Sequence, residues 1–315
     1  MEIPTIDDIL KAHKLISPFI HKTPLLSSKS INQMLGAEIY FKCENLQKVG
    51  AFKFRGACNS VFSLTDEQAK NGVATHSSGN HAQALALAAK MRGIPAYIVV
   101  PNNAPNVKKK AIEGYGAEVT YCEPTLKARE TTLNAVVEKT GANFIHPYDN
   151  PKVIAGQGTA ALEAFEQIQA IDIMMAPVGG GGLLSGTSIA SKAISPKTLV
   201  YAGEPENADD AFRSFYSGEF VESSNPKTIA DGLLTSLSKR TYHIIKQNVD
   251  AIFTAQEETI VKAMQLIWER MKIIVEPSSA VPLAAIMENL ETFKGKKIVI
   301  IVSGGNVELS NLPFV

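Results

Sequence analysis

A run of four glycines, Gly179 to Gly182, constrains the fold more than any other feature of the chain. It stands between an apolar segment that ends at Pro177 and an Ala/Ser-rich helical pattern. We interpret the run as having no packing purpose, since bare backbone can turn sharply and present successive N–H groups to a ligand. The helix that follows adds its positive N-terminal end. A flexible turn, the simpler interpretation, needs only one or two glycines. The run therefore predicts a strand–loop–helix unit that binds a phosphate.

The glycine run does not match the common nucleotide-binding motifs. It lacks the Gly-Lys-Ser/Thr ending of a P-loop, and it is not a G-x-G-x-x-G sequence followed by an acidic residue for a ribose. We therefore expect a ligand that carries a small monophosphate.

Strand and helix patterns alternate along the chain. Strand patterns at 96–100 and 118–121 are each followed by a helical pattern, and a second series of comparable size comes later. Such alternation predicts right-handed crossovers and mostly parallel, twisted sheets. We expect an α/β protein of two lobes, with residues 1–69 and 149–315 in a large domain and residues 70–148 in a small one.

Composition excludes several classes of protein. Lys+Arg and Asp+Glu balance at 31 each and no basic stripe is present, which argues against a nucleic-acid partner. The N-terminus has no apolar targeting region and the longest apolar runs are strand-sized, so we expect a cytoplasmic protein without a membrane partner. Cys43, Cys58 and Cys122 lack C-x-x-C spacing, which predicts reduced thiols rather than disulfides or a zinc site.

Lys53 stands between Phe52 and Phe54, just before a helical pattern. Apolar surroundings disfavour the ammonium form, and a neutral amine can condense with an aldehyde. The alternative is a surface lysine whose stem covers apolar groups. That alternative is the more common case, and the residues by themselves favour it.

Two further polar clusters follow expected strands. Residues 77–81 hold two serines, an asparagine and a histidine before an Ala-rich helix, and residues 303–306 follow the apolar run 297–302. An N-cap and a polar exit turn are the simpler interpretations. Ligands of parallel sheets bind beyond the carboxyl ends of the strands, where both clusters fall.

An acidic loop, 204–210, carries Glu204 and Asp210 six residues apart. Carboxylates together with a backbone carbonyl suit a hard cation. A solvated acidic turn is the alternative that spacing by itself favours.

Five motifs taken together resemble fold-type II pyridoxal-phosphate enzymes, whose fold is that of the tryptophan synthase β chain. Within that group they resemble the serine racemase and serine/threonine dehydratase family, in whose order they run from about residue 20 to 306. The motifs are Ala-Phe-Lys-Phe-Arg-Gly-Ala at 51–57, Ser-Ser-Gly-Asn-His at 77–81, the glycine run with Leu183, Glu-Pro-Ser at 276–278, and Ser-Gly-Gly-Asn at 303–306.

The resemblance implies roles for individual residues. Lys53 would hold the cofactor aldehyde as an aldimine and remove the α-proton, and Ser78 would be the acid/base on the opposite face. Asn80 would bond the ring hydroxyl and Ser303 the pyridine nitrogen, where a hydroxyl makes the ring a weaker electron sink than an aspartate would. The other implied residues are Gly179, Gly180, Gly181, Gly182 and Leu183 for the phosphate, and Ser77, Ser78 and His81 for the substrate carboxylate.

The acidic loop also resembles the cation site of serine racemases through the segment Glu-Pro-x-Asn-Ala-Asp-Asp. The implied ligands are Glu204, the carbonyl of Ala208, and Asp210. Magnesium suits such an oxygen-only site, with manganese or calcium as substitutes.

The implied activity is dehydration of a small β-hydroxy amino acid, serine first, to a keto acid and ammonia, with or without racemisation to D-serine. Threonine and threo-3-hydroxyaspartate are alternative substrates, since bacterial hydroxyaspartate dehydratases share much of the same pattern. Three departures leave the balance of racemisation and dehydration open: Ala51 stands where many relatives have serine, residues 276–280 differ from the animal serine racemases, and residues 146–149 are closer to dehydratases. A cysteine-synthase type of β-replacement needs a Ser-Val-Lys-Asp-Arg motif, which residues 52–55 do not provide. A non-catalytic sensor that binds pyridoxal phosphate is a distant alternative.

The resemblance also bears on assembly and regulation. Relatives are commonly dimers, so we expect a homodimer, and activation by a nucleotide such as ATP or AMP stays open. The regulatory domain of biosynthetic threonine dehydratases does not follow the last motif, so feedback inhibition by isoleucine is not expected.

Overall fold

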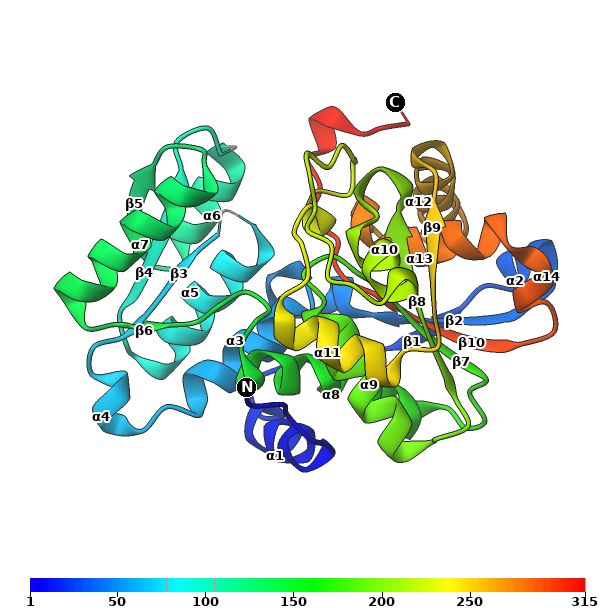
Figure 1. Cartoon of the computed structure of the whole chain (residues 1–315), viewed down its shortest axis with the longest axis horizontal. Coiled ribbons are helices and arrows are strands. Elements are labelled where there is room, and N and C mark those ends of the chain that lie inside the picture. Colours follow the sequence, from blue (N-terminus) through cyan, green and yellow to red (C-terminus); the bar gives the residue numbers. More distant parts are fainter. Residues whose placement is uncertain (78, 105, 315) are drawn as a thin grey trace.

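The computed structural model describes residues 1–77, 79–104 and 106–314. Its strands form two separate sheets, one in each of the two lobes of Figure 1. The large sheet contains β1 (Leu25–Ser27), β2 (Glu38–Cys43), β7 (Ile173–Pro177), β8 (Leu199–Pro205), β9 (Ala251–Ala255) and β10 (Lys297–Val302). The small sheet contains β3 (Val73–His76), β4 (Ala96–Pro101), β5 (Glu118–Cys122) and β6 (Asn143–Phe144).

Both sheets are mostly parallel, as predicted. The large sheet has the order β1-β2-β10-β7-β8-β9 and the small sheet the order β5-β4-β3-β6. Among the described strands, β1 with β2 is the antiparallel pair. Central β10 is buried from Ile298 to Val302, as a strand covered on both faces must be. The edge strands β1 and β9 were not identified from the sequence, but the predicted α/β fold is confirmed.

Helices cover the faces of both sheets (Figure 1). Several begin at polar caps; for example, Asn150 accepts hydrogen bonds from the amides of Lys152 and Val153. The helices are α1 (Ile6–Ile16), α2 (Lys29–Leu35), α3 (Lys53–Phe62), α4 (Asp66–Ala69), α5 (Asn80–Arg92), α6 (Asn106–Gly114), α7 (Leu126–Thr140), α8 (Pro151–Gln167), α9 (Gly182–Ile194), α10 (Asp210–Ser217), α11 (Lys239–Asn248), α12 (Glu257–Met271), α13 (Pro277–Glu288) and α14 (Leu290–Phe293).

Helices α3 and α8 approach each other at backbone contact. A Cβ on Gly156 would lie 2.6 Å from the Cα of Gly56, so neither position has room for a side chain. The amide of Gly56 also donates to Oε1 of Gln157 at 3.1 Å. Because α3 begins at Lys53, this close packing fixes the origin of that side chain.

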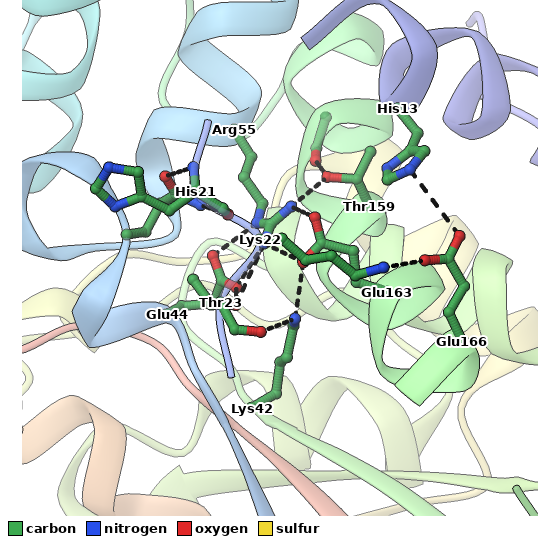
Figure 2. A network of polar contacts seen from close by, with 12 residues as sticks. His13, His21, Lys22, Thr23, Lys42, Glu44, Arg55, Thr159, Glu163 and Glu166 are labelled. Carbon is green, nitrogen blue, oxygen red and sulfur yellow. Dashed lines mark hydrogen bonds and ion pairs between the residues drawn. The ribbon is translucent and has the colours of Figure 1, made fainter. Parts of the chain in front are cut away.

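A cluster of buried ions lies beside this contact (Figure 2). Arg55 donates to both oxygens of Glu44 at 2.7 and 2.8 Å and to both oxygens of Glu163 at 2.8 Å. Lys42 donates to Glu163 at 2.7 Å, and Thr159 accepts from Arg55 at 3.2 Å. Burial raises the pKa of the Glu163 carboxyl, but Arg55 and Lys42 outweigh it and the net pKa is lowered. This ion cluster ties β2, α3 and α8 together.

Three other predictions concern the whole chain. All three cysteines are free and buried, as predicted. No helix in the described ranges is long and apolar enough to cross a membrane. The strands of the small sheet all fall between residues 73 and 144, inside the span predicted for the small domain. The domain boundaries themselves stay a prediction.

Candidate functional site

A cavity of about 350 Å³ lies between the lobes, beyond the carboxyl ends of strands from both sheets. Its wall includes His76 at the end of β3, Pro177 at the end of β7 and Ser303 just after β10. The structure brings nearly all the predicted cofactor and substrate residues to this wall. They are Lys53, Ser77, Asn80, His81, Gly179 to Gly182, Leu183 and Ser303. Ser78 lies outside the described residues.

Lys53 reaches the cavity from the first turn of α3. Its Nζ donates to the carbonyl of Pro147 at 3.0 Å and lies 5.1 Å from the centre of the Phe52 ring. Burial lowers the pKa of Lys53 to about 8, although the Glu276 carboxylate acts in the opposite direction. The amine is therefore far easier to deprotonate than an ordinary lysine, which is the condition for nucleophilic attack on an aldehyde.

The four glycines have a packing purpose, contrary to our expectation. A Cβ on Gly180 would lie 2.4 Å from the ring of Tyr148, and one on Gly179 would lie 2.8 Å from the Cα of Leu233. Gly181 has φ +82°, a conformation that side chains disfavour. The loop is thus wedged between Tyr148 on one side and residues 232–241 on the other, and it can only be made of glycine.

The same loop still offers its amides to the cavity. Among the described residues, the amides of Gly179 to Leu183 donate no hydrogen bond. The first amides of α9 lack intrahelical partners by the geometry of any helix start, and the helix dipole adds positive potential there. Close packing therefore shapes the loop while its N–H groups remain available for an anion, and the phosphate role stays a prediction.

Ser303 and Ser279 form a buried pair of hydroxyls at the other end of the cavity. Their Oγ atoms lie 3.0 Å apart, and Ser279 also contacts the amide and the carbonyl of Gly304, both at 2.7 Å. Ser303 lines the cavity, whereas Ser279 lies behind it at the start of α13. A hydroxyl at this wall can donate to a heteroaromatic nitrogen.

Asn80 lies at the cavity wall, but its amide is engaged by the protein. Its Nδ2 lies 3.2 and 3.1 Å from the two oxygens of Glu276, and its Oδ1 accepts from Asn306 at 2.9 Å. The predicted bond to a ring hydroxyl would have to use the remaining capacity of this amide. Sequence reasoning gave Glu276 and Asn306 no function, although both stand in motifs that it singled out.

Burial favours the neutral form of three imidazoles at the cavity. Burial lowers the pKa of His81 to about 3 and that of His146 to about 4, and it also lowers the pKa of His76. In His81, Nε2 lies 3.1 Å from the carbonyl of Ile145, so Nε2 carries the proton and Nδ1 is an acceptor. The ring of His81 offers no cation, and a carboxylate here would depend on main-chain amides near Ser77 and the start of α5.

The predicted cation ligands lie outside the cavity wall, at the carboxyl end of β8. Both oxygens of Asp210 are buried without a hydrogen bond of normal geometry, and burial raises the pKa of Asp210 to about 6. The pKa of Glu204 is also raised, first by burial and then by Asp210, while its oxygens accept from the amides of Ala211 and Phe212. Two adjacent buried carboxylates fit a bound cation. No described group of three or more His, Cys, Asp or Glu side chains could hold a metal.

The residues missed by sequence reasoning are those that support others. Tyr148, Ser279 and Leu233 act by packing on the loop or bonding a neighbour, so no pattern of spacing identifies them. Glu276 and Ser279 stand in the segment that departs from the animal racemases. That departure was the one available signal.

Comparison with known proteins finds relatives that match along nearly the whole chain. A family model for pyridoxal-phosphate dependent enzymes matches residues 16–304. A β-hydroxyaspartate dehydratase of Paracoccus denitrificans (strain Pd 1222) is 52% identical over all of both chains. The serine racemase of Dictyostelium discoideum is 54% identical and covers 99% of this chain and 98% of its own length.

Solved structures agree with these relatives. The maize serine racemase superposes with a TM-score of 0.96 at 45% identity, covering 98% of this chain and 95% of that one. Its agreement extends over both lobes, so it includes the cavity between them. The chain therefore belongs to the family of pyridoxal-phosphate-dependent enzymes.

Proposed function

We propose that this enzyme dehydrates a small β-hydroxy amino acid, serine first, to a keto acid and ammonia, with or without racemisation to the D-enantiomer. One observation carries the proposal: a lysine amine whose pKa is lowered to about 8 shares a cavity with a glycine loop of unpaired amides and a serine hydroxyl. These groups match the aldehyde, phosphate and pyridine nitrogen of one cofactor. Relatives named as serine racemases and as a β-hydroxyaspartate dehydratase support it.

The residues around the cavity fit pyridoxal phosphate. When bound, this cofactor withdraws electrons from the α-carbon of an amino acid and so makes its proton acidic. The amides of Gly179 to Leu183 would hold the phosphate, and Ser303 would donate to the ring nitrogen. A hydroxyl holds a neutral nitrogen and cannot pair with a pyridinium charge as an aspartate would. This arrangement suits prompt loss of a β-hydroxyl group.

Two residues would move protons at the α-carbon. Lys53, once its amine is released from the cofactor, would remove the α-proton from one face, for which its lowered pKa is suited. Ser78 would act on the opposite face, and proton return from there would give the D-enantiomer. Ser77 and the amides at the start of α5 would hold the substrate carboxylate.

A second substrate, threo-3-hydroxyaspartate, is favoured by Arg129. This guanidinium lies at the cavity wall on the small-lobe side, and its Nε is buried without a partner in the described part of the chain. A second carboxylate on the substrate would pair with it through charge-assisted hydrogen bonds. Serine offers no group of that charge.

We further infer a divalent cation, magnesium or in its place manganese or calcium, bound by Glu204, Asp210 and the carbonyl of Ala208. Buried carboxylates with raised pKa values support it, because a cation would remove the repulsion between them. A homodimer and a nucleotide effector (ATP or AMP) stay predictions from the resemblance, and a cytoplasmic location stays a prediction from the N-terminal sequence.

The test is a substrate panel. Purified protein with pyridoxal phosphate and magnesium is mixed with L-serine, L-threonine or L-threo-3-hydroxyaspartate, and keto acid, ammonia and D-enantiomer are measured. We expect keto acid from at least one of them. No product from any of the three, with the cofactor spectrum present, would overturn the proposal.

Two variants sharpen this test. Arg129→Met should lower kcat/KM for hydroxyaspartate by about 10- to 100-fold and leave serine little changed, if the second carboxylate binds there. Ser78→Ala should remove D-enantiomer formation while keto acid formation continues. D-serine formed at an unchanged rate by this variant would contradict the role of Ser78.

A further inference from the structure

The hydroxyl of Ser279 lies in a position that the proposed reaction does not by itself explain. Ser279 is fully buried in the first turn of α13, and it does not reach the cavity wall. It nevertheless lies 3.0 Å from the Oγ of Ser303, which is on that wall. The question is which way the two hydroxyl protons point.

The single hydroxyl proton of Ser279 has two acceptors within hydrogen-bond distance. Its Oγ accepts the amide of Gly304 at 2.7 Å and has two neighbouring acceptors, the carbonyl of Gly304 at 2.7 Å and the Oγ of Ser303. The carbonyl of Gly304 already accepts the amide of Glu276 at 3.0 Å. The proton of Ser279 is therefore free to go to Ser303 without leaving that carbonyl unpaired.

A proton from Ser279 changes what Ser303 can do. When the Ser303 oxygen accepts the proton of Ser279, the proton of Ser303 cannot lie between the same two oxygens. It is then directed toward the cavity. The chain then runs from the Gly304 amide through Ser279 to Ser303, and successive hydrogen bonds in such a chain strengthen one another. If Ser303 donated to Ser279 instead, it would offer the cavity only a lone pair.

The same segment also holds the lysine end of the site. The carbonyl of Ser303 accepts the amide of Phe52 at 2.9 Å, and Gly304 forms a bridge with Ala51. Lys53 follows directly on this pairing. By accepting the amide of Gly304, Ser279 fixes the spacing between Ser303 and Lys53.

We propose that Ser279 is a positioning residue that donates its proton to Ser303 and so directs the Ser303 hydroxyl to the pyridine nitrogen of the cofactor. This inference rests on the proposed assignment of Ser303 to that nitrogen. It adds a buried residue that never touches the cofactor but sets how strongly one end of it is bound.

The experiment is a double-mutant cycle on cofactor affinity. Pyridoxal phosphate is titrated into cofactor-free preparations of the wild type, Ser279→Ala, Ser303→Ala and the double variant, and Kd is read from absorbance. We expect Ser279→Ala to raise Kd by about 5- to 10-fold, the size of one hydrogen bond. In the Ser303→Ala background the same substitution should change Kd by less than about twofold, because the two residues act in one hydrogen-bond chain.

Two further variants keep the cycle interpretable. Ser191→Ala removes another buried hydroxyl, which donates to the carbonyl of Thr187 at 2.8 Å, and should leave Kd unchanged. Ser279→Cys has a slightly larger side chain that donates weakly, so its Kd should fall between those of the wild type and Ser279→Ala, and it serves if Ser279→Ala fails to fold.

Each outcome is decisive. If Ser279→Ala raises Kd equally in both backgrounds, Ser279 acts only by holding the backbone of Gly304, and the inference is overturned. No change of Kd in either background would overturn it as well. If Ser303→Ala itself leaves Kd and the cofactor spectrum unchanged, the assignment of Ser303 fails instead. Keto acid formation by wild type under the same conditions reports separately on the proposed reaction.

Discussion

Two polar regions of this enzyme lie near the start of α3 and differ in how their groups are paired. In the ion cluster, Arg55, Lys42, Glu44 and Glu163 are buried, and the two cations face two anions at hydrogen-bond distance. Around the cavity and the acidic loop, the amides of the glycine loop, Nδ1 of His81 and both oxygens of Asp210 make no hydrogen bond of normal geometry to the described residues.

The difference separates structure from function. Burying a charge costs several kcal/mol unless it is paired. Each charge of the ion cluster is paired within the chain, so the cluster needs no ligand. A buried polar group without a partner needs an explanation, and at a cavity wall a bound ligand can supply the missing partner. Lys53 and Arg55, two residues apart on one helix, therefore serve opposite purposes: one must be able to lose its proton, and the other must keep its charge.

Replacing the two cations of α3 should break different properties, and Lys53→Ala has the largest expected effect. It removes the cofactor-bearing amine and the base together, so kcat should fall by at least about 10³-fold. Thermal stability should stay near that of the wild type, since Lys53 is a half-buried cation without a salt bridge in the described structure. Lys48→Ala, a lysine that does not line the cavity, is the control and should keep full activity. Activity retained by Lys53→Ala would contradict the assignment.

Arg55→Met should lower the stability of the protein, because Arg55 belongs to the ion cluster. It leaves two buried carboxylates facing each other with one lysine, and the free energy of unfolding should fall by about 3–5 kcal/mol. Urea denaturation measures this change. Lys22→Met removes an exposed partner of Glu166 at 3.0 Å and should leave the urea midpoint unchanged. Equal midpoints for both variants would mean that burial does not distinguish the two ion pairs.

Acid should weaken the cavity through His81. Its pKa is about 3 in the folded protein against an ordinary 6.5, so below pH 6.5 the unfolded chain binds a proton that the folded one refuses. Stability from this group is complete above pH 6.5 and falls as the pH is lowered, by about 2 kcal/mol at pH 5. The free energy of unfolding of His81→Asn should fall by correspondingly less between pH 7 and pH 5. Identical losses in wild type and variant would place the acid sensitivity elsewhere.

The smallest expected effect concerns the acidic loop. Magnesium at saturating concentration should raise the Tm of the wild type by about 2–4 °C, as a cation bound only by the folded state must. Asp210→Asn should remove this rise. A variant that responds to magnesium like the wild type would show that the cation binds at another place, and no response in the wild type would argue against the site.

Much of the fold was predictable because its signals are local. The apolar run at 297–302 and the Ala-rich helix after Asn80 follow patterns that need no knowledge of the rest of the chain. The cofactor residues were predictable for a related reason, since chemistry at the ends of parallel strands demands particular residue types. Strand β9 was missed because its pattern is short and lies at an edge.

What could not be predicted depends on long-range packing. The glycines were thought free of packing, yet Tyr148 and Leu233, which leave them no room, come from distant segments. Arg55 was singled out only as part of a motif, because its partners Glu44 and Glu163 lie 11 and 108 residues away. Ser279 acts through Ser303, a relation that sequence spacing does not encode.

The most direct measurement is to locate the covalent bond. The holoenzyme is reduced with borohydride, which fixes the cofactor to the amine that carries it, and the digested protein is mapped by mass spectrometry. The account predicts a phosphopyridoxyl group on the peptide that contains Lys53. The same group on another lysine, or on none while the enzyme is active, would contradict it.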